Sequence, residues 1–515
     1  MARALPKGST VAVIGAGAMG AGIAQIAAQN GHPVQLHDTR VGAADAGKRA
    51  IADVLGKLVA KGKLAAADAD AALARITTAV ELADAGVAAL VVEAIVEDLA
   101  VKRELLASLE NVVAADCILA SNTSSISITA LAAGAKHPQR IVGMHFFNPA
   151  PLMPLVEVVS GLATAREVAD TIHATAAAWG KTPVHATSTP GFIVNRCARP
   201  FYAEGLRLLA ERAADPATID AVMREAGGFR MGPFELMDLI GHDVNFAVTR
   251  SVWEAYFHDP RYAPSVVQQE LVAAGFHGRK SGRGFFDYAS GTVKPEPATE
   301  TARTRPQQVV VHGELGVAAV LAERLAGAGA ALERTRADSR FPSGALHVPG
   351  AGGGVWLAPT DGRTATTRVA ATGVRDLVLF DLAFDYATAT RLAVARADTC
   401  ADGAYAAAVG TLQAAGLAVS RLDDVAGLAV MRTVTMLANE AADAVMQGVA
   451  DPAAVDLAMQ KGVNYPRGPL AWADAIGLDR VAAVLGHLAA HYGEDRYRTS
   501  PLLARRSAAG GSLHG

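Results

Sequence analysis

The chain has 515 residues, of which 51% are hydrophobic and 19% are charged, and its formal net charge at pH 7 is −3. This length predicts about three or four domains with sizeable cores, and the small net charge excludes a general attraction to nucleic acid or to an anionic membrane. Three cysteines are too few for a disulfide framework and match no metal-ligand spacing, and no apolar run reaches about 18 residues, so we expect no metal, no membrane span and a cytoplasmic location.

The first predicted unit, from Thr10 to Asp38, has the pattern of a strand, a tight turn, a helix and a second strand. Gly15, Gly17 and Gly20 follow the first apolar run at G-x-G-x-x-G spacing. A glycine at the first position permits a tight turn, the second lets the backbone approach a pyrophosphate, and the third lets the helix pack on the strand. In this strand–turn–helix context the motif predicts a dinucleotide-binding site.

Asp38 lies 18 residues after Gly20, where it can end the second strand and accept a hydrogen bond from a ribose 2′-hydroxyl. An acid at this position favours NAD over NADP because it would repel the 2′-phosphate. The helix N-terminus, with Ala18 and Met19, presents amide groups and a partial positive charge to the phosphates. Two alternatives are a secretory signal peptide, although the glycines break its apolar run too often, and a glycine-rich turn that binds nothing.

A charged, alanine-rich segment with helical periodicity follows, to about residue 74. It carries five basic residues: Lys48, Arg49, Lys57, Lys61 and Lys63. Lys57 and Lys61 are four residues apart and therefore share one helix face. The segment is either a solvated helix face or a patch for a substrate that carries several phosphates.

Apolar runs at 88–95, 117–120, 141–145 and 155–159 predict strands that alternate with helices up to about residue 188. Continuous apolar runs are typical of buried parallel strands. A polar turn at 121–125 follows one of these strands directly, and ligands of open α/β sheets bind at the carboxyl ends of the strands. The fold class predicted for residues 1–188 is therefore an α/β Rossmann-type doubly wound parallel sheet.

Beyond residue 188 the strand signals stop, and helical spacing predicts an all-α domain at 189–288. A proline-rich linker follows at 289–307. The segment 308–420 has strand and helix signals, but its glycine motif has decayed to Gly313 and Gly316. We therefore expect a small, degenerate α/β domain there that binds no nucleotide.

The last block, 421–515, repeats the first helical domain at a constant offset of 236 positions. The offset relates Gly191 to Gly427, Arg196 to Arg432, Glu204 to Glu440, Asp215-Pro216 to Asp451-Pro452, Asp220 to Asp456, Gly232-Pro233 to Gly468-Pro469, Asp238 to Asp474 and Gly241 to Gly477. An ungapped repeat of this length indicates a duplication. The chain is therefore expected to hold two copies of one helical domain.

Four residues form the candidate catalytic group: His145, Glu157, Ser124 and Asn195. Oxidation of an alcohol needs a base for the hydroxyl proton while hydride leaves, and histidine suits that role near neutral pH. His145 and Glu157 belong to consecutive strands, so they can lie side by side, and the carboxylate can then orient the imidazole. Ser124 and Asn195 could bond the substrate oxygen. The alternatives are a structural histidine at a strand end and a glutamate that faces water.

Several segments together resemble the 3-hydroxyacyl-CoA dehydrogenase family: VVEAIVEDL at 91–99, SNTSS at 121–125, GMHFFNP at 143–149, LVEVV at 155–159, PGFIVNR at 190–196, MGPFELMDLIG at 231–241 and GRKSGRGFFDY at 278–288. The similarity covers residues 9–288 almost continuously. The degenerate middle and the repeated last domain resemble the long bacterial branch of the family. The resemblance implies NAD-dependent oxidation of (S)-3-hydroxyacyl-CoA in β-oxidation-like pathways. Its substrate would be 3-hydroxybutyryl-CoA or, in phenylacetate degradation, 3-hydroxyadipyl-CoA.

The resemblance also assigns roles. It implies that His145 is the base, that Glu157 orients it, and that Ser124 and Asn195 hold the substrate oxygen and the histidine. Its cofactor contacts fall on the glycine turn and on Asp38, Glu97, Lys102, Asn122 and Asn148. The lysine-rich helix becomes the expected site for the CoA phosphates, with Lys57 and Lys63 as the contacts.

In the second copy Met431 replaces Asn195, and no SNTSS or HFFNP segment precedes it, so this copy is expected to be non-catalytic. The helical domain makes the dimer in the family, so the second copy is expected to supply an internal version of that contact, and the protein to form a homodimer or a higher homo-oligomer. Two other functions stay open: a dehydrogenase of a free β-hydroxy acid, an enzyme type that typically uses a lysine as acid/base, and a non-enzymatic member that kept the fold.

Overall fold

The computed structural model describes residues 3–515. The chain forms two compact units, each with its own core. The first comprises the residues up to 196 together with 447–463, and the second comprises 197–446 and 464–515. Within residues 3–515, no helix is long and apolar enough to cross a membrane.

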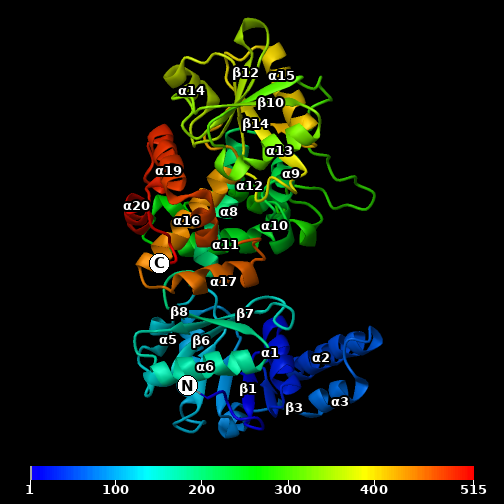
Figure 1. Cartoon of the computed structure of the whole chain (residues 1–515). Helices are drawn as coiled ribbons and strands as arrows, with labels where there is room; N and C mark the ends of the chain where they lie inside the picture. Colours follow the sequence, from blue (N-terminus) through cyan, green and yellow to red (C-terminus); the bar gives the residue numbers. More distant parts are fainter. Residues whose placement is uncertain (1–2) are drawn as a thin grey trace. The chain divides into compact units, whose positions relative to one another are not determined.

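The first unit is built on an eight-stranded sheet with the order β3-β2-β1-β4-β5-β6-β7-β8 (Figure 1). Its strands are β1 (Val11–Ile14), β2 (Val34–His37), β3 (Ile76–Ala79), β4 (Leu90–Glu93), β5 (Ile118–Ser121), β6 (Ile141–Phe146), β7 (Leu155–Ser160) and β8 (Thr182–Thr187). The pairs are parallel, as the sequence predicts, except that β6 and β7 run antiparallel. The eight residues between β6 and β7 are too few for a crossover helix, which explains the reversal.

Helices cover this sheet because its strands are apolar on both faces. They are α1 (Ala18–Gln29), α2 (Ala43–Ala60), α3 (Ala66–Ala74), α4 (Leu99–Leu109), α5 (Ile128–Ala132), α6 (Arg166–Ala178) and α7 (Val194–Cys197). An apolar cluster joins α1, α2, α3 and α6 to the buried strand residues Val13, Val92 and Met144. This core holds the carboxyl ends of β1, β4, β5 and β6 at one edge of the sheet.

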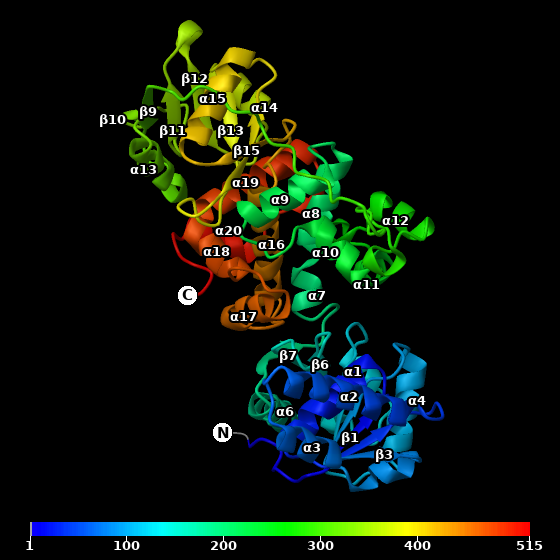
Figure 2. The same cartoon turned by 90° about the vertical axis from the view of Figure 1, so that its right-hand side faces the viewer.

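A helix from the end of the chain completes the first unit. Helix α17 (Pro452–Gly462) packs on β7 and β8, and both views show it beside the sheet (Figures 1 and 2). Asp451 caps it by accepting a hydrogen bond from the amide of Ala454, and proline at the first helical position needs no amide partner. The sequence placed this helix in the last domain, because a helical repeat reveals its own boundaries and not the sheet on which it packs.

The second unit contains a seven-stranded sheet with the order β10-β9-β11-β12-β13-β14-β15 (Figure 2). Its strands are β9 (Gln308–His312), β10 (Ala331–Thr335), β11 (Ala345–Val348), β12 (Val355–Pro359), β13 (Leu377–Phe380), β14 (Arg391–Arg396) and β15 (Ala418–Arg421), flanked by α13 (Val320–Gly327), α14 (Ala365–Thr372) and α15 (Asp402–Ala414). β13 and β14 begin 236 residues after β6 and β7 and pair in the same antiparallel register. The duplication therefore includes the sheet.

The other helices of this unit are α8 (Arg199–Ala210), α9 (Pro216–Glu225), α10 (Pro233–Ile240), α11 (His242–Ala255), α12 (Val266–Ala273), α16 (Val430–Met446), α18 (Pro469–Ile476), α19 (Leu478–Tyr492) and α20 (Pro501–Ala508). α8 and α16, which correspond in the two copies, pack on each other. α9, the counterpart of α17, packs on β14, the counterpart of β7. In both units, therefore, this helix packs on the sheet of the opposite copy.

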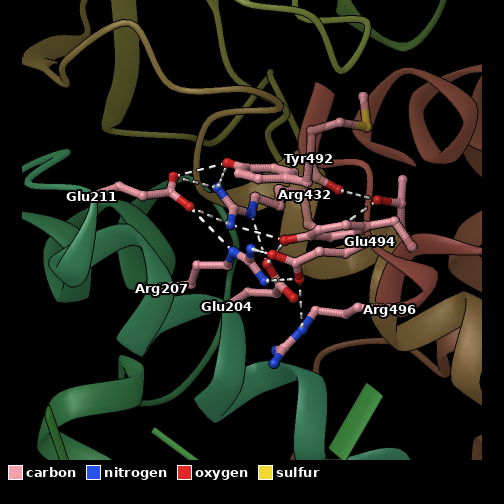
Figure 3. Close-up of polar contacts among 10 residues, drawn as sticks. Glu204, Arg207, Glu211, Arg432, Tyr492, Glu494 and Arg496 are labelled. Atoms are coloured by element: carbon pink, nitrogen blue, oxygen red, sulfur yellow. Dashed lines mark hydrogen bonds and ion pairs between the residues drawn. The ribbon is translucent and has the colours of Figure 1, made fainter. Parts of the chain in front are cut away.

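Buried polar contacts between the two helical copies are reciprocal. The hydroxyl of Tyr262 donates to Glu440 at 2.6 Å, and the hydroxyl of Tyr497 donates to Glu204 at 2.9 Å. Arg432 adds an ion pair to Glu204, whose neighbours are drawn in Figure 3. Because each copy supplies the same donor and acceptor, the contact has the form of an isologous interface within one chain.

Substitution of Gly462 tests the packing of α17 on the first sheet. A Cβ at this position would lie 2.6 Å from Leu155 Cδ2 and 3.0 Å from Val194 Cγ2. Helical Gly→Ala substitutions without such contacts stabilise by about 0.4–1 kcal/mol. We expect Gly486→Ala, on the exposed face of α19 with no atom within 4 Å, to raise the melting temperature, and Gly462→Ala to lower it. Thermal unfolding of both variants checks this, and equal stabilisation would contradict the packing.

Candidate active site

The turn between β1 and α1 has the geometry of a phosphate-binding loop. Gly15 has φ +101°, and a Cβ there would lie 2.6 Å from the carbonyl oxygen of Ala94. A Cβ on Gly20 would overlap the carbonyl oxygen of Gly15, whereas one on Gly17 would meet no atom within 4 Å. No side chain caps α1 at Gly17. The approach to the first amides of the helix, at Ala18 and Met19, is therefore open to a pyrophosphate.

Asp38 sits at the end of β2 and joins this turn. Its Oδ2 accepts a hydrogen bond from the amide of Ala16 at 2.9 Å, and its Oδ1 accepts from the amide and the Nε of Arg40 at 3.0 and 3.1 Å. The hydrogen bond from the Arg40 side chain is the main cause that lowers the pKa of Asp38 to about 2. The carboxylate is thus charged at all physiological pH values. The residues of this site fit an NAD molecule with an unphosphorylated ribose.

Glu97 organises the polar turn after β5. Its Oε1 accepts hydrogen bonds from the amides of Ser124 and Ser125 and from the hydroxyl of Thr123, at 2.6–3.1 Å. Lys102 lies behind it, 1% exposed, and its Nζ bonds Glu93 at 2.8 Å and faces Glu97 Oε2 at 3.4 Å. A direct contact of Lys102 with the cofactor stays a prediction, because the described partners of its ammonium group are these carboxylates and the carbonyl of Ile95.

Glu93 was not predicted to belong to the site. This acid is fully buried at the end of β4, where it accepts from Lys102 and from the hydroxyl of Ser121. The signal that could have found it was a carboxylate inside an apolar run, because such a group needs a buried partner. Asn122 also has a structural role, since its Oδ1 accepts from the amide of Phe146 at 2.9 Å.

His145 and Glu157 face each other across β6 and β7. They are directly opposed in the antiparallel register, and His145 Nδ1 lies 2.6 Å from Glu157 Oε2. Because a carboxylate only accepts hydrogen bonds, Nδ1 carries the proton and Nε2 keeps a free lone pair. The ring packs against Phe147 and Phe192, with centroids at 4.5 and 5.7 Å, which fixes its plane.

The other oxygen of Glu157 binds the start of α7. Oε1 accepts from the amides of Ile193 and Val194, both at 3.0 Å. Gly191 and Phe192, just before these amides, have φ values of +76° and +47°, and a positive φ is strained for phenylalanine. The turn is held in this conformation because it aims two amides at one buried carboxylate. Glu157 therefore links His145 to the helix that carries Asn195.

Ser124 and Asn195 are brought together, as expected of residues that share a substrate. The Asn195 Nδ2 donates to the carbonyl oxygen of Ser124 at 3.3 Å. Among the described contacts, the Ser124 hydroxyl has no hydrogen-bond partner in the protein, so it can serve a ligand. Asn148 is exposed in the loop after β6, and its cofactor contact stays a prediction.

The lysines of α2 and of the turn after it have different surroundings. Lys48 Nζ donates to the carbonyl oxygen of Ile76 at 2.6 Å and holds α2 to β3. Lys57 and Lys63 are exposed at the end of this helix and in the turn that follows. Their contact with CoA phosphates stays a prediction.

The second sheet carries no equivalent of the His–Glu pair. The offset of 236 places Asp381 at the position of His145 and Ala393 at the position of Glu157. The buried Asp381 accepts from the amides of Ala429, Val430 and Met431 at 2.8–3.0 Å, the first two being the counterparts of Ile193 and Val194. Asp381, which occupies the position of His145, thus accepts the amide hydrogen bonds at the start of α16 that Glu157 accepts at the start of α7.

Comparison with known proteins gives three family matches. Residues 10–189 match the NAD binding domain of 3-hydroxyacyl-CoA dehydrogenase, and residues 191–288 and 427–512 both match its C-terminal domain. Residues 357–425 match the reduced Rossmann-fold domain of 3-hydroxybutyryl-CoA dehydrogenase.

Relatives span all or half of the chain. A 3-hydroxyadipyl-CoA dehydrogenase of Escherichia coli is 44% identical over 508 residues, 97% of both chains. A probable 3-hydroxybutyryl-CoA dehydrogenase of Deinococcus radiodurans is 45% identical over 276 residues, which is 54% of this chain and 99% of the relative. A crystal structure of 3-hydroxybutyryl-CoA dehydrogenase from Escherichia coli K12 covers 98% of this chain and 99% of its own, with a TM-score of 0.88 and 41% identity.

Replacement of Asp381 tests its structural role. Asp381→Ala leaves at least three buried amides without an acceptor, and each such loss costs about 1–3 kcal/mol. We expect a marked fall in melting temperature, with Asp381→Asn intermediate because one amide oxygen remains. Thermal unfolding measures both variants. An unchanged melting temperature for the alanine variant would contradict the anchoring role.

Replacement of Asp38 tests cofactor choice. Asp38→Ala removes the acceptor for the 2′-hydroxyl and frees the guanidinium of Arg40 to pair with a 2′-phosphate. We expect the ratio of kcat/KM for NAD to that for NADP to fall by about tenfold or more, equivalent to about 1.4 kcal/mol. The double variant with Arg40→Ala should lose the gain for NADP.

The pH dependence of cofactor choice follows from the same pair. Because the pKa of Asp38 is about 2, the carboxylate stays ionised throughout the neutral range. We expect the preference of the wild-type protein for NAD to be flat between about pH 7.5 and pH 9, where the 2′-phosphate of NADP, with a second pKa of about 6, is also fully ionised. Steady-state measurements with both cofactors check this, and a preference that titrates within this range would show that another group sets it.

Proposed function

The chain belongs to the 3-hydroxyacyl-CoA dehydrogenase family, and we propose that it oxidises short-chain (S)-3-hydroxyacyl-CoA thioesters through a reaction in which His145 is the base. Enzymes of this family are oxidoreductases, and this chain carries their NAD-binding domain. The observation that supports the proposal best is the 2.6 Å contact between His145 and Glu157, buried at the end of the sheet where the dinucleotide turn also lies.

The cofactor site is formed by residues of the first sheet. The glycine turn and the α1 N-terminus would hold the pyrophosphate, and Asp38 would accept from the adenosine ribose. When bound, NAD supplies the acceptor for the hydride that leaves C3 of the substrate. Glu97 would keep the turn at 123–125 in place beside it.

His145 moves the proton. In the oxidation direction its Nε2 takes the proton of the 3-hydroxyl as the C3–H bond breaks, so that a ketone forms and the imidazole becomes an imidazolium. Glu157 stabilises this cation and holds the tautomer with the proton on Nδ1. In the reduction direction His145 returns the proton to the oxygen. The proton transfers in both directions need no group beyond the pair and the substrate, while the hydride exchange needs the bound nicotinamide.

Ser124 and Asn195 would position the reacting oxygen. The Ser124 hydroxyl can donate to it, and the Asn195 amide is fixed to the backbone of the same turn. Hydrogen bonds placed where charge develops lower the barrier most. In this arrangement Glu97 holds the turn after β5, Glu157 holds the start of α7, and the bond from Asn195 to Ser124 joins the two.

The substrate proposal is an acyl-CoA thioester of short chain, 3-hydroxybutyryl-CoA or 3-hydroxyadipyl-CoA. It rests on the relative named 3-hydroxyadipyl-CoA dehydrogenase, which matches this chain over 97% of its length, and on the shorter relatives named for 3-hydroxybutyryl-CoA. Lys57 and Lys63 would contact the CoA phosphates. A cytoplasmic location and a homodimer or higher homo-oligomer complete the proposal.

His145→Gln tests the mechanism. Glutamine can still donate a hydrogen bond to Glu157 but cannot take a proton, and general acid–base catalysis contributes about 10²–10⁴-fold. We expect kcat for acetoacetyl-CoA reduction, followed by NADH absorbance, to fall by about that factor while NADH affinity by fluorescence titration stays unchanged. Glu157→Gln should lower kcat less, because Nε2 keeps its lone pair.

The same assay separates the rival functions. Turnover of free 3-hydroxybutyrate at the rate of its CoA thioester would contradict the thioester proposal. Near-normal kcat in His145→Gln would remove the histidine from the mechanism.

A further inference from the structure

The second unit contains a cavity of about 160 Å³ beside α8. One face of α8 forms its wall, and α11, α12, the segment 260–265 and Arg496 close it. Four arginines line it: Arg199, Arg207, Arg261 and Arg496. A single water molecule needs only about 10–15 Å³ on this measure, so the cavity can hold a small organic molecule.

The guanidinium groups in the wall are incompletely bonded. The Nε atoms of Arg199, Arg261 and Arg496 are buried without a hydrogen-bond partner. Arg199 and Arg261 are 5% and 2% exposed, so water does not cover them. Buried donors without acceptors are rare and costly in native proteins. Three of them on the arginines of one cavity wall show that the protein supplies fewer acceptors there than these side chains can bind.

The charges of three of these arginines are offset by carboxylates of the protein. Arg207 pairs with Glu211 and Glu494, Arg261 pairs with Glu440 and Asp443, and Arg496 lies 3.9 Å from Glu494 (Figure 3). The acids that neighbour these arginines therefore leave no excess positive charge on this part of the wall.

Arg199 differs from the other three. Its Nη1 donates to the hydroxyl of Thr249 at 3.0 Å, and its guanidinium lies over the ring of Tyr202 at 4.8 Å. No carboxylate of the described chain pairs with it, and burial lowers its pKa as expected for such a cation. A buried charge without a counter-ion is strongly unfavourable because it has lost its hydration. Arg199 therefore leaves one positive charge of the cavity wall without an anionic partner.

The rest of the wall is apolar. Ala203, Leu206, Ala210 and Pro264 line the cavity between the arginines. Phosphates and sulfate would gain nothing from these surfaces, whereas a short hydrocarbon chain would. The missing anion therefore fits a carboxylate on a short aliphatic body.

The second copy lacks this arrangement. At the offset of 236, Thr435 replaces Arg199, Ala438 replaces Tyr202 and Asp443 replaces Arg207. Thr435 is buried and donates to the carbonyl of Met431 at 2.9 Å, so the same helix position folds without a buried cation. The helical scaffold does not require Arg199.

We propose that the cavity beside α8 binds the carboxylate of a short aliphatic acid, with Arg199 as its cationic partner. The acid has two sources: a free carboxylic acid, or the far end of an acyl-CoA whose acyl chain ends in a second carboxylate. The second source rests on the proposed function.

Calorimetry with adipate tests the site without any turnover. Wild-type protein should bind adipate and butyrate, while 1-butanol, which lacks a carboxylate, should not bind. Arg199→Met should lose adipate affinity by about tenfold or more, and the matched control Arg250→Met, an exposed arginine on α11, should not. Adipate should also raise the melting temperature of the wild-type protein.

Kinetics distinguish the two sources. If the acyl tail supplies the carboxylate, Arg199→Met raises KM for 3-oxoadipyl-CoA by about tenfold or more and leaves acetoacetyl-CoA unchanged. If a free acid supplies it, neither substrate responds and only adipate binding is lost. The proposal is overturned if Arg199→Met changes neither adipate binding nor the preference between the two substrates.

A stability measurement excludes a structural role. Removal of a buried, unpaired charge by a residue of similar length is neutral or stabilising, so Arg199→Met should melt at or above the wild-type temperature. A lower melting temperature together with unchanged adipate binding overturns the proposal. Arg199→Lys keeps the charge but not the planar fork, and should retain weakened adipate binding.

Discussion

The rest of the first unit depends on how the carboxylate of Glu157 is held. It is buried in an apolar sheet, so every lone pair must find a donor. One oxygen binds His145 and the other binds the two amides at the start of α7. The strained turn at Gly191 and Phe192 exists to aim those amides. His145, the strand pair and the helix with Asn195 are therefore positioned by one buried carboxylate.

The second half of the chain keeps the same turn and helix start without the His–Glu pair. Its turn keeps positive φ values at Gly427 and Leu428, and its helix start still requires an acceptor. Asp381 supplies that acceptor from the position of the lost histidine, and Ala393 fills the position of the lost glutamate. Both halves thus keep the amide–carboxylate contact, and in the first half the carboxylate also pairs with His145.

Exchange of helices links the copies. α17 of the second copy completes the first sheet unit, and α9 of the first copy packs on β14 of the second sheet. The reciprocal bonds of Tyr262 and Tyr497 bury polar groups that neither copy could satisfy alone. The copies have diverged within this interface. Where one has Asp443 the other has Arg207, and where one has Thr435 the other has Arg199, and these two arginines line the cavity beside α8.

Sequence alone determined the glycine turn, the acid Asp38 that follows the second strand, and the alternating strands, because each depends on residues close together in the chain. It also determined the ungapped repeat, because a constant offset can be found by aligning the chain with itself. It also suggested His145 and Glu157, since a carboxylate in an apolar strand needs a partner. Tertiary structure decided the antiparallel register that opposes these two residues, the packing of α17 on the first sheet, the replacement by Asp381 and the unpaired charge of Arg199. These features join residues up to hundreds of positions apart, and no local pattern specifies which distant groups share a buried space.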